Sequence, residues 1–135
     1  MNGLPLLLTI PMAPVTKKNS QRIIQMRTRD GNAYHRILPS KAYEKYEAAA
    51  MQHMPRLMDP ISRKVNVQCV YYMPTRRKVD LVNLQEATLD VLVHYGVLED
   101  DNSSIVVSMD GSKVRYDKAN PRTEILISEV VDRYD

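Results

Sequence analysis

The residues with the clearest chemical potential are acidic and lie close together in the sequence. Residues 80–112 hold seven carboxylates and no Lys or Arg, although basic residues outnumber acidic ones in the chain as a whole. Carboxylates repel a phosphate unless a cation neutralises them, and Mg²⁺ and Mn²⁺ prefer carboxylate oxygens. The pattern allows two interpretations, a divalent-cation site and an acidic helix that merely faces water. The seven residues are Asp80, Glu86, Asp90, Glu99, Asp100, Asp101 and Asp110.

The basic residues gather before this acidic stretch. Residues 1–79 hold 14 Lys and Arg against 4 Asp and Glu, in a chain whose net charge is only +3. Such a basic surface favours a polyanionic partner, most often nucleic acid, although it also serves solubility. A basic surface next to an acidic pocket is the charge arrangement of a metal-dependent nuclease. The residues that we expect to contact a phosphate backbone are Lys17, Lys18, Arg22, Arg27, Arg29, Arg76, Arg77, Lys78 and Lys113.

A helix must position the first part of the acidic stretch. Asp80 is a suitable N-cap and Gly96 a suitable C′ residue, which predicts a helix that ends near residue 95. One side of this helix is apolar, and the opposite side carries Asn83, Glu86, Asp90 and His94. Repulsion between Glu86 and Asp90, one turn apart, costs about 0.2–0.5 kcal/mol, which a metal-binding or proton-handling face would tolerate. The sequence leaves open whether Asp101, beyond this helix, meets Asp80.

The other elements follow from hydrophobic alternation and turn residues. Ser40 is predicted to cap a second helix, which Pro55 ends. The fold class is therefore α+β, with a mixed or mainly antiparallel sheet and two main helices in a single domain of residues 1–135. Strands are expected at residues 6–10, 65–73, 105–109 and 123–131, with 113–116 pairing back on 105–109, and a hairpin joins 23–27 to 34–38.

Composition limits the class of protein. The chain has 135 residues, of which 44% are hydrophobic, as in an ordinary globular domain. The longest apolar run, residues 4–8, is too short to cross a bilayer, so we expect no membrane association. Cys69 is the only cysteine and cannot form an intrachain disulfide, which favours a cytoplasmic protein. The small aliphatic core makes stabilisation by oligomerisation plausible.

Several motifs follow one another around the acidic stretch. They are Met73-Pro74, the basic run of residues 76–78, Asp80-Leu81-Val82-Asn83-Leu84, Asp90-Val91-Leu92, Gly96 and Asp100-Asp101. This series resembles the RusA family of Holliday junction resolvases. The resemblance implies acidic residues that bind Mg²⁺ or Mn²⁺, and a symmetric homodimer that nicks two strands of a four-way DNA junction.

Two positions depart from the family pattern. By position, Asp80 matches the first aspartate of the motif and Asn83 its asparagine, but the second aspartate is Val82 here and the helical lysine is Glu86. We interpret Glu86 as compensation for the carboxylate that Val82 lacks. The alternative is that catalysis is lost or altered.

This interpretation assigns roles to the acidic residues. The catalytic residues are then Asp80, Glu86 and Asp101, the metal ligands are these three together with Asp100, and Asn83 and Asp90 have supporting roles. The electrostatic help of the missing lysine would have to come from elsewhere, such as Lys78 or Lys113.

The resemblance implies a metal-dependent, structure-selective endonuclease that resolves Holliday junctions by paired symmetric nicks in DNA recombination and repair. Resolvases of this kind are often encoded by prophages. Two alternatives remain open: a junction-binding protein of the same fold without catalysis, and a module that binds a basic protein through its acidic face.

Overall fold

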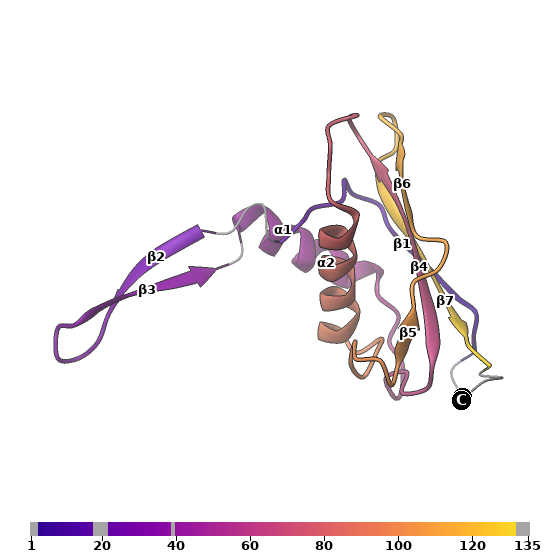
Figure 1. Cartoon of the computed structure of the whole chain (residues 1–135), viewed down its shortest axis with the longest axis horizontal. Helices are drawn as coiled ribbons and strands as arrows, with labels where there is room; N and C mark the ends of the chain where they lie inside the picture. The colour runs from indigo at the N-terminus through magenta and orange to yellow at the C-terminus, as the bar shows by residue number, and fades with distance from the viewer. Residues whose placement is uncertain (1–2, 18–21, 39, 132–135) are drawn as a thin grey trace.

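The computed structural model describes residues 3–17, 22–38 and 40–131. It contains one main sheet, one separate hairpin and two α-helices (Figure 1). The elements in chain order are β1 Leu6–Ile10, β2 Arg22–Arg27, β3 Ala33–Leu38, α1 Lys41–Ala50, the short 3-10 helix η2 Met51–His53, β4 Val65–Met73, α2 Leu81–His94, β5 Val106–Ser108, β6 Lys113–Tyr116 and β7 Arg122–Glu129. The predicted α+β class with a mixed sheet is confirmed.

Strand β4 is the centre of the main sheet. Antiparallel pairing joins β1 to β7 and β7 to β4, while β5 and β6 both run parallel to β4. Alternate residues of β4 are buried, as the sequence predicts, and both helices lie on the same side of the sheet (Figure 1). The core is therefore a single layer of side chains between the sheet and the two helices.

The predicted pairing of residues 113–116 with residues 105–109 is wrong. Strands β5 and β6 pair instead with successive parts of the same edge of β4, β5 beside Val65 and β6 beside residues 70–73. The turn between them does not reverse the chain, because the Asn66 side chain binds the backbone of Asp110 on both sides, at 2.8 and 3.1 Å. Ser112 Oγ then accepts from the backbone N–H of Cys69 at 3.0 Å, which returns the chain to β4.

The ends of both helices follow from their capping residues. Ser40 Oγ accepts from the backbone N–H of Tyr43 at 3.0 Å at the start of α1, and Asp80 Oδ1 accepts from the backbone N–H of Val82 at 3.0 Å at the start of α2. Gly96 has a φ of 75° just after α2, where a glycine is favoured. Helix α1 ends at Ala50, sooner than Pro55 predicts, and η2 follows it.

A buried polar contact fixes α2 on the sheet. The hydroxyl groups of Tyr71, on β4, and Thr88, on α2, lie 2.7 Å apart, and Thr88 Oγ1 also donates to the carbonyl of Leu84 at 3.0 Å. Both residues are almost completely buried. This contact orients the polar face of α2 away from the sheet, where the residues predicted to do chemistry lie.

The β2–β3 hairpin extends away from the body of the molecule (Figure 1). Its register pairs Gln25 with His35 and Met26 with Tyr34, which confirms the predicted hairpin. In the part of the chain that the structure describes, no helix combines the length and apolar character that crossing a bilayer requires.

Candidate active site and nucleic-acid surface

Asp80 lies at the amino end of α2. Asp80 is exposed, and one of its carboxylate oxygens accepts the capping hydrogen bond from the backbone N–H of Val82. The basic run of residues 76–78 precedes it in the loop that leads from β4 to α2, and all three of these residues are exposed. Asp80 therefore lies close in the chain to the basic residues of the predicted motif.

A cleft of about 320 Å³ lies beside the carboxyl-terminal half of α2, and we call it the acidic cleft. Four separate parts of the chain form it: the loop after β1, helix α1, helix α2 and the loop that follows α2. Its lining residues are Lys17, Glu47, Asp90, Val93, His94 and Asp101. The cleft thus unites Asp90 and Asp101 from the acidic stretch with residues more than 40 positions earlier.

The carboxyl group of Asp101, in the lining of the cleft, has a raised pKa. Desolvation raises its pKa above the ordinary value even though the residue as a whole is exposed, and the hydrogen bond and charge of Asp100 and the charge of Asp90 raise it further. The two carboxylates Asp90 and Asp101 therefore repel each other across the cleft. A divalent cation between such groups would remove this repulsion.

Asp100 has a different role from its neighbour. Its carboxylate accepts from the backbone N–H of Asp101 at 2.7 Å and from Asn102 Nδ2 at 3.0 Å. Both bonds lie within the loop after α2. Asp100 therefore fixes the shape of this loop, and Asp101 reaches the cleft.

The other acids of the cleft already have partners. Lys17 Nζ lies 3.2 Å from Asp90 Oδ2, with 40% and 39% of the two side chains exposed, and 5.8 Å from the ring centre of Tyr43. Glu47 accepts from the Tyr43 hydroxyl at 3.0 Å and lies 3.8 Å from His94 Nδ1. Among the described residues, no Lys or Arg forms an ion pair with Asp101, so its charge is the least compensated in the cleft.

The remaining predicted site residues lie between Asp80 and the cleft. Asn83 is half-buried and Glu86 is exposed, one helical turn before Asp90. From Asp80 to Asp90 the helix rises about 15 Å, at 1.5 Å per residue. Within the described ranges, no three His, Cys, Asp or Glu residues come close enough to hold one ion. The structure thus places Asp101 and Asp90 in the same cleft. Asp80 and Glu86 lie nearer the amino end of α2.

A second cavity, of about 460 Å³, lies at the end of β4 next to β6, and we call it the basic pocket. It is lined by Met73, Thr75, Arg76, Arg77, Val114, Arg115 and Tyr116. A smaller hollow of about 280 Å³ shares Thr75 and Arg77 with it and is also lined by Lys78. The basic run of residues 76–78 therefore lines two adjoining hollows.

The other predicted DNA-binding residues are dispersed. Lys113 is exposed at the start of β6, and Arg27 and Arg29 are exposed on the β2–β3 hairpin. Lys18 and the side chain of Arg22 lie outside the described part of the chain.

Sequence reasoning missed four residues of these two sites. Glu47 and His94 approach each other only because α1 packs beside α2, and neither has a spacing typical of a ligand. His94 shares a helix face with Asp90, which is the one signal that pointed to it. Arg115 and Tyr116 join the basic pocket through the parallel pairing of β6 with β4, which local pattern did not predict.

Comparison with known protein families gives one match. The model of a family described as endodeoxyribonuclease RusA matches residues 11–128, from the end of β1 almost to the end of β7. No curated protein matches the chain.

Proposed function

The chain belongs to the endodeoxyribonuclease RusA family, which implies Holliday junction resolvase activity, and from this premise we propose a metal-dependent enzyme that makes paired symmetric nicks in four-way DNA junctions. Its role would be in DNA recombination and repair, in the cytoplasm. The observation that carries the metal dependence is that two carboxylates, Asp90 and Asp101, line the same cleft, where the charge of Asp90 contributes to the raised pKa of Asp101.

The donor set of the acidic cleft fits Mg²⁺ or Mn²⁺. Mg²⁺ is commonly held by one or two carboxylates, and water and substrate phosphate oxygens complete its coordination. We propose that Asp101 and Asp90 hold the ion, while Asp100 keeps the loop of Asp101 in place. Bound Mg²⁺ or Mn²⁺ would supply an acidified water and offset negative charge on the phosphate under attack.

The basic residues would act on the DNA backbone rather than on base sequence. Arg76, Arg77 and Lys78 are exposed next to Asp80, so they can hold a phosphate chain along the amino end of α2. Lys17 is paired with Asp90, and a metal ion at Asp90 would free it for a DNA phosphate. Lys17 would thereby supply the positive charge that Glu86 does not.

A homodimer would join the two parts of the predicted ligand set. Within one chain, Asp80 is about 15 Å from Asp90 along α2, whereas a two-fold arrangement with antiparallel α2 helices brings the amino end of one helix to the carboxyl end of the other. Val82 supports a contact there, because it is an apolar residue of α2 that is 57% exposed. We propose that Asp80 of one copy completes the site of Asp90 and Asp101 in the other, with Glu86 beside it.

Mixing inactive protomers tests this shared site. Asp80→Asn and Asp101→Asn are each expected to abolish nicking alone. Heterodimers formed by refolding the two variants together should regain nicking of one strand, because one site then holds both wild-type residues. If the mixture stays inactive although heterodimers form, the site lies within one chain.

Junction cleavage tests the proposed function as a whole. The wild-type protein should nick a synthetic four-way junction in pairs with Mg²⁺ or Mn²⁺, leave a linear duplex intact and be inactive in EDTA. Manganese binding followed by electron paramagnetic resonance should be lost in Asp101→Asn, independently of DNA. Tight junction binding without cleavage in any metal would instead support the non-catalytic junction binder. Equal binding of junction and duplex would support the acidic-face interaction module.

A further inference from the structure

The basic pocket differs from a simple phosphate site. Arg76, Arg77 and Arg115 are among its lining residues, but the lining also includes the aromatic Tyr116 and the apolar Val114 and Met73. Tyr116 is 41% exposed and Val114 is 38% exposed, so both present apolar surface to solvent. Such a surface does not bind a phosphate, whereas a nucleobase can stack on it.

Two arginine–tyrosine stacks lie at this end of the sheet. The Arg122 guanidinium lies 3.8 Å from the ring centre of Tyr72, and the Arg76 guanidinium lies 4.3 Å from that of Tyr116. Both pairs place a planar cation over an aromatic face. They differ in what surrounds the cation.

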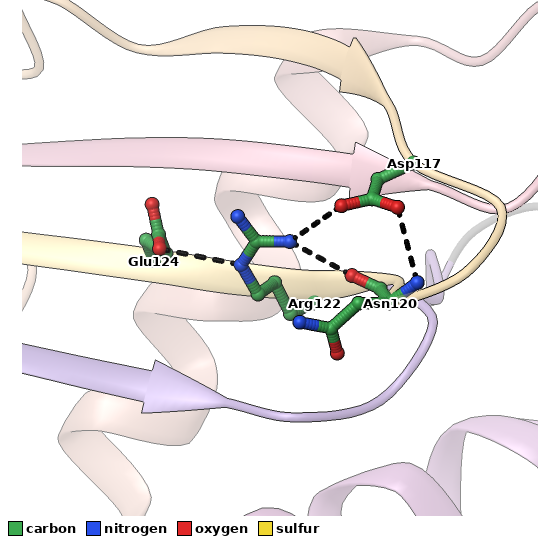
Figure 2. A network of polar contacts seen from close by, with 4 residues as sticks. All are labelled: Asp117, Asn120, Arg122 and Glu124. Atoms are coloured by element: carbon green, nitrogen blue, oxygen red, sulfur yellow. Dashed lines mark hydrogen bonds and ion pairs between the residues drawn. The ribbon is translucent and has the colours of Figure 1, made fainter.

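The charge of Arg122 is fully engaged within the protein. Its Nη1 donates to Asp117 Oδ2 and to the carbonyl of Asn120, each at 2.9 Å, and its Nε donates to Glu124 Oε2 at 3.2 Å (Figure 2). Asp117 also accepts from the backbone N–H of Asn120 at 3.1 Å. This network closes the turn between β6 and β7, and its arginine has a structural role.

The arginines near Tyr116 are instead exposed to solvent. In the described part of the chain, no carboxylate forms an ion pair with Arg76, Arg77 or Arg115. The planes of the Arg76 guanidinium and the Tyr116 ring are both surfaces on which an unstacked base can lie. The pocket volume of about 460 Å³ is within the usual range for small-ligand sites.

We propose that the basic pocket binds one unpaired nucleotide of the DNA, with its base stacked on the pair formed by Tyr116 and Arg76 and its phosphate on Arg77. The branch point of a junction would provide this nucleotide, and this source rests on the proposed function. Residues 74–79 connect the pocket directly to Asp80, so a base held there fixes the strand next to the carboxylates of α2.

Binding measurements in EDTA test the pocket without cleavage. The DNA probes are a four-way junction with intact bases, the same junction with abasic sites at the branch point, a single-stranded oligonucleotide and a linear duplex. Tyr116→Ala should weaken binding of the intact junction and of the single strand about tenfold. Binding of the duplex should change less than twofold. Tyr116→Phe keeps the ring and should bind as the wild type does.

The abasic junction identifies the base as the contact. It should bind the wild type about tenfold more weakly than the intact junction does, while Tyr116→Ala should bind both junctions equally. Far-ultraviolet circular dichroism of each variant checks that the fold is kept. Arg77→Ala should weaken every probe, because its contact is with phosphate.

The outcomes separate the pocket from the function. If Tyr116→Ala binds all four probes as the wild type does while Arg77→Ala weakens them, the pocket takes phosphate only and the proposal is wrong. If the wild type does not distinguish junction from duplex, the proposed function fails, but Tyr116-dependent binding of the single strand would still support the nucleotide pocket.

Discussion

The acidic cleft and the basic pocket lie towards opposite ends of α2 and carry opposite charge. In the cleft, the carboxylates of Asp90 and Asp101 repel each other, and Lys17 is the only Lys or Arg in the lining. The lining of the pocket includes three arginines and a tyrosine, and no carboxylate of the described residues forms an ion pair with these arginines. The acidic cleft would repel a phosphate unless a cation is bound there. The basic pocket would attract a phosphate without a cation.

In the proposed function, this difference separates DNA binding from phosphodiester cleavage in space. The pocket and its adjoining hollow can hold a DNA strand without metal, because their charge is already positive. In the proposed function, the acidic cleft binds the same strand only when it holds a metal ion. Variants in the two regions should therefore affect different measurements, and four changes test that expectation.

The largest effect is expected for Asp101→Asn. The change removes the least compensated carboxylate of the cleft, so junction nicking with Mg²⁺ should fall at least about 100-fold, the scale of several kcal/mol that a bound metal contributes. Junction affinity in EDTA should stay within twofold of the wild type, as measured by gel shift. Asp100→Asn is the matched control and should lose much less activity. Equal losses in the two variants would contradict the separate roles of these neighbours.

The next effect belongs to the basic pocket. Arg76→Ala together with Arg77→Ala should weaken junction binding about tenfold and reduce the slope of log affinity against log salt by about 2, one for each lost phosphate contact. Nicking at saturating enzyme should be nearly unchanged. An unchanged salt slope would show that these arginines do not contact phosphate.

A smaller effect is expected for Lys17→Met, which tests competition within the cleft. Lys17 lies 3.2 Å from Asp90, so it competes with a metal ion for that carboxylate. Removing its charge should tighten Mn²⁺ binding by about fivefold, roughly 1 kcal/mol, as expected for a partly exposed ion pair. Isothermal titration without DNA measures this, and Lys17→Arg should resemble the wild type. Weaker Mn²⁺ binding by Lys17→Met would contradict the competition.

The smallest functional effect is expected from a change outside the linings of both regions. Ser40→Ala removes the cap of α1 and should reduce the free energy of unfolding by about 1 kcal/mol in urea titration. Metal affinity and junction affinity should not change. If they do, loss of stability alone can imitate the effects expected of the other three variants.

Local patterns in the sequence determined most of the secondary structure. The alternation of β4, the capping residues Ser40 and Asp80, and the glycine after α2 each depend on neighbours within a few residues. Their physical causes, side-chain direction and unsatisfied backbone groups at helix ends, act over one or two turns. The separation of basic and acidic stretches was also visible in the sequence, as were the family motifs.

The tertiary structure alone decided which charged groups meet. Asp101 lies beside Asp90 and Glu47 because the chain turns at Gly96 and α1 packs beside α2, whereas Asp80 lies at the far end of a straight helix. Tyr116 meets Arg76 because β6 runs parallel to β4 and ends beside Met73. Contacts of this kind depend on how distant segments pack together, and no spacing along the chain encodes that packing.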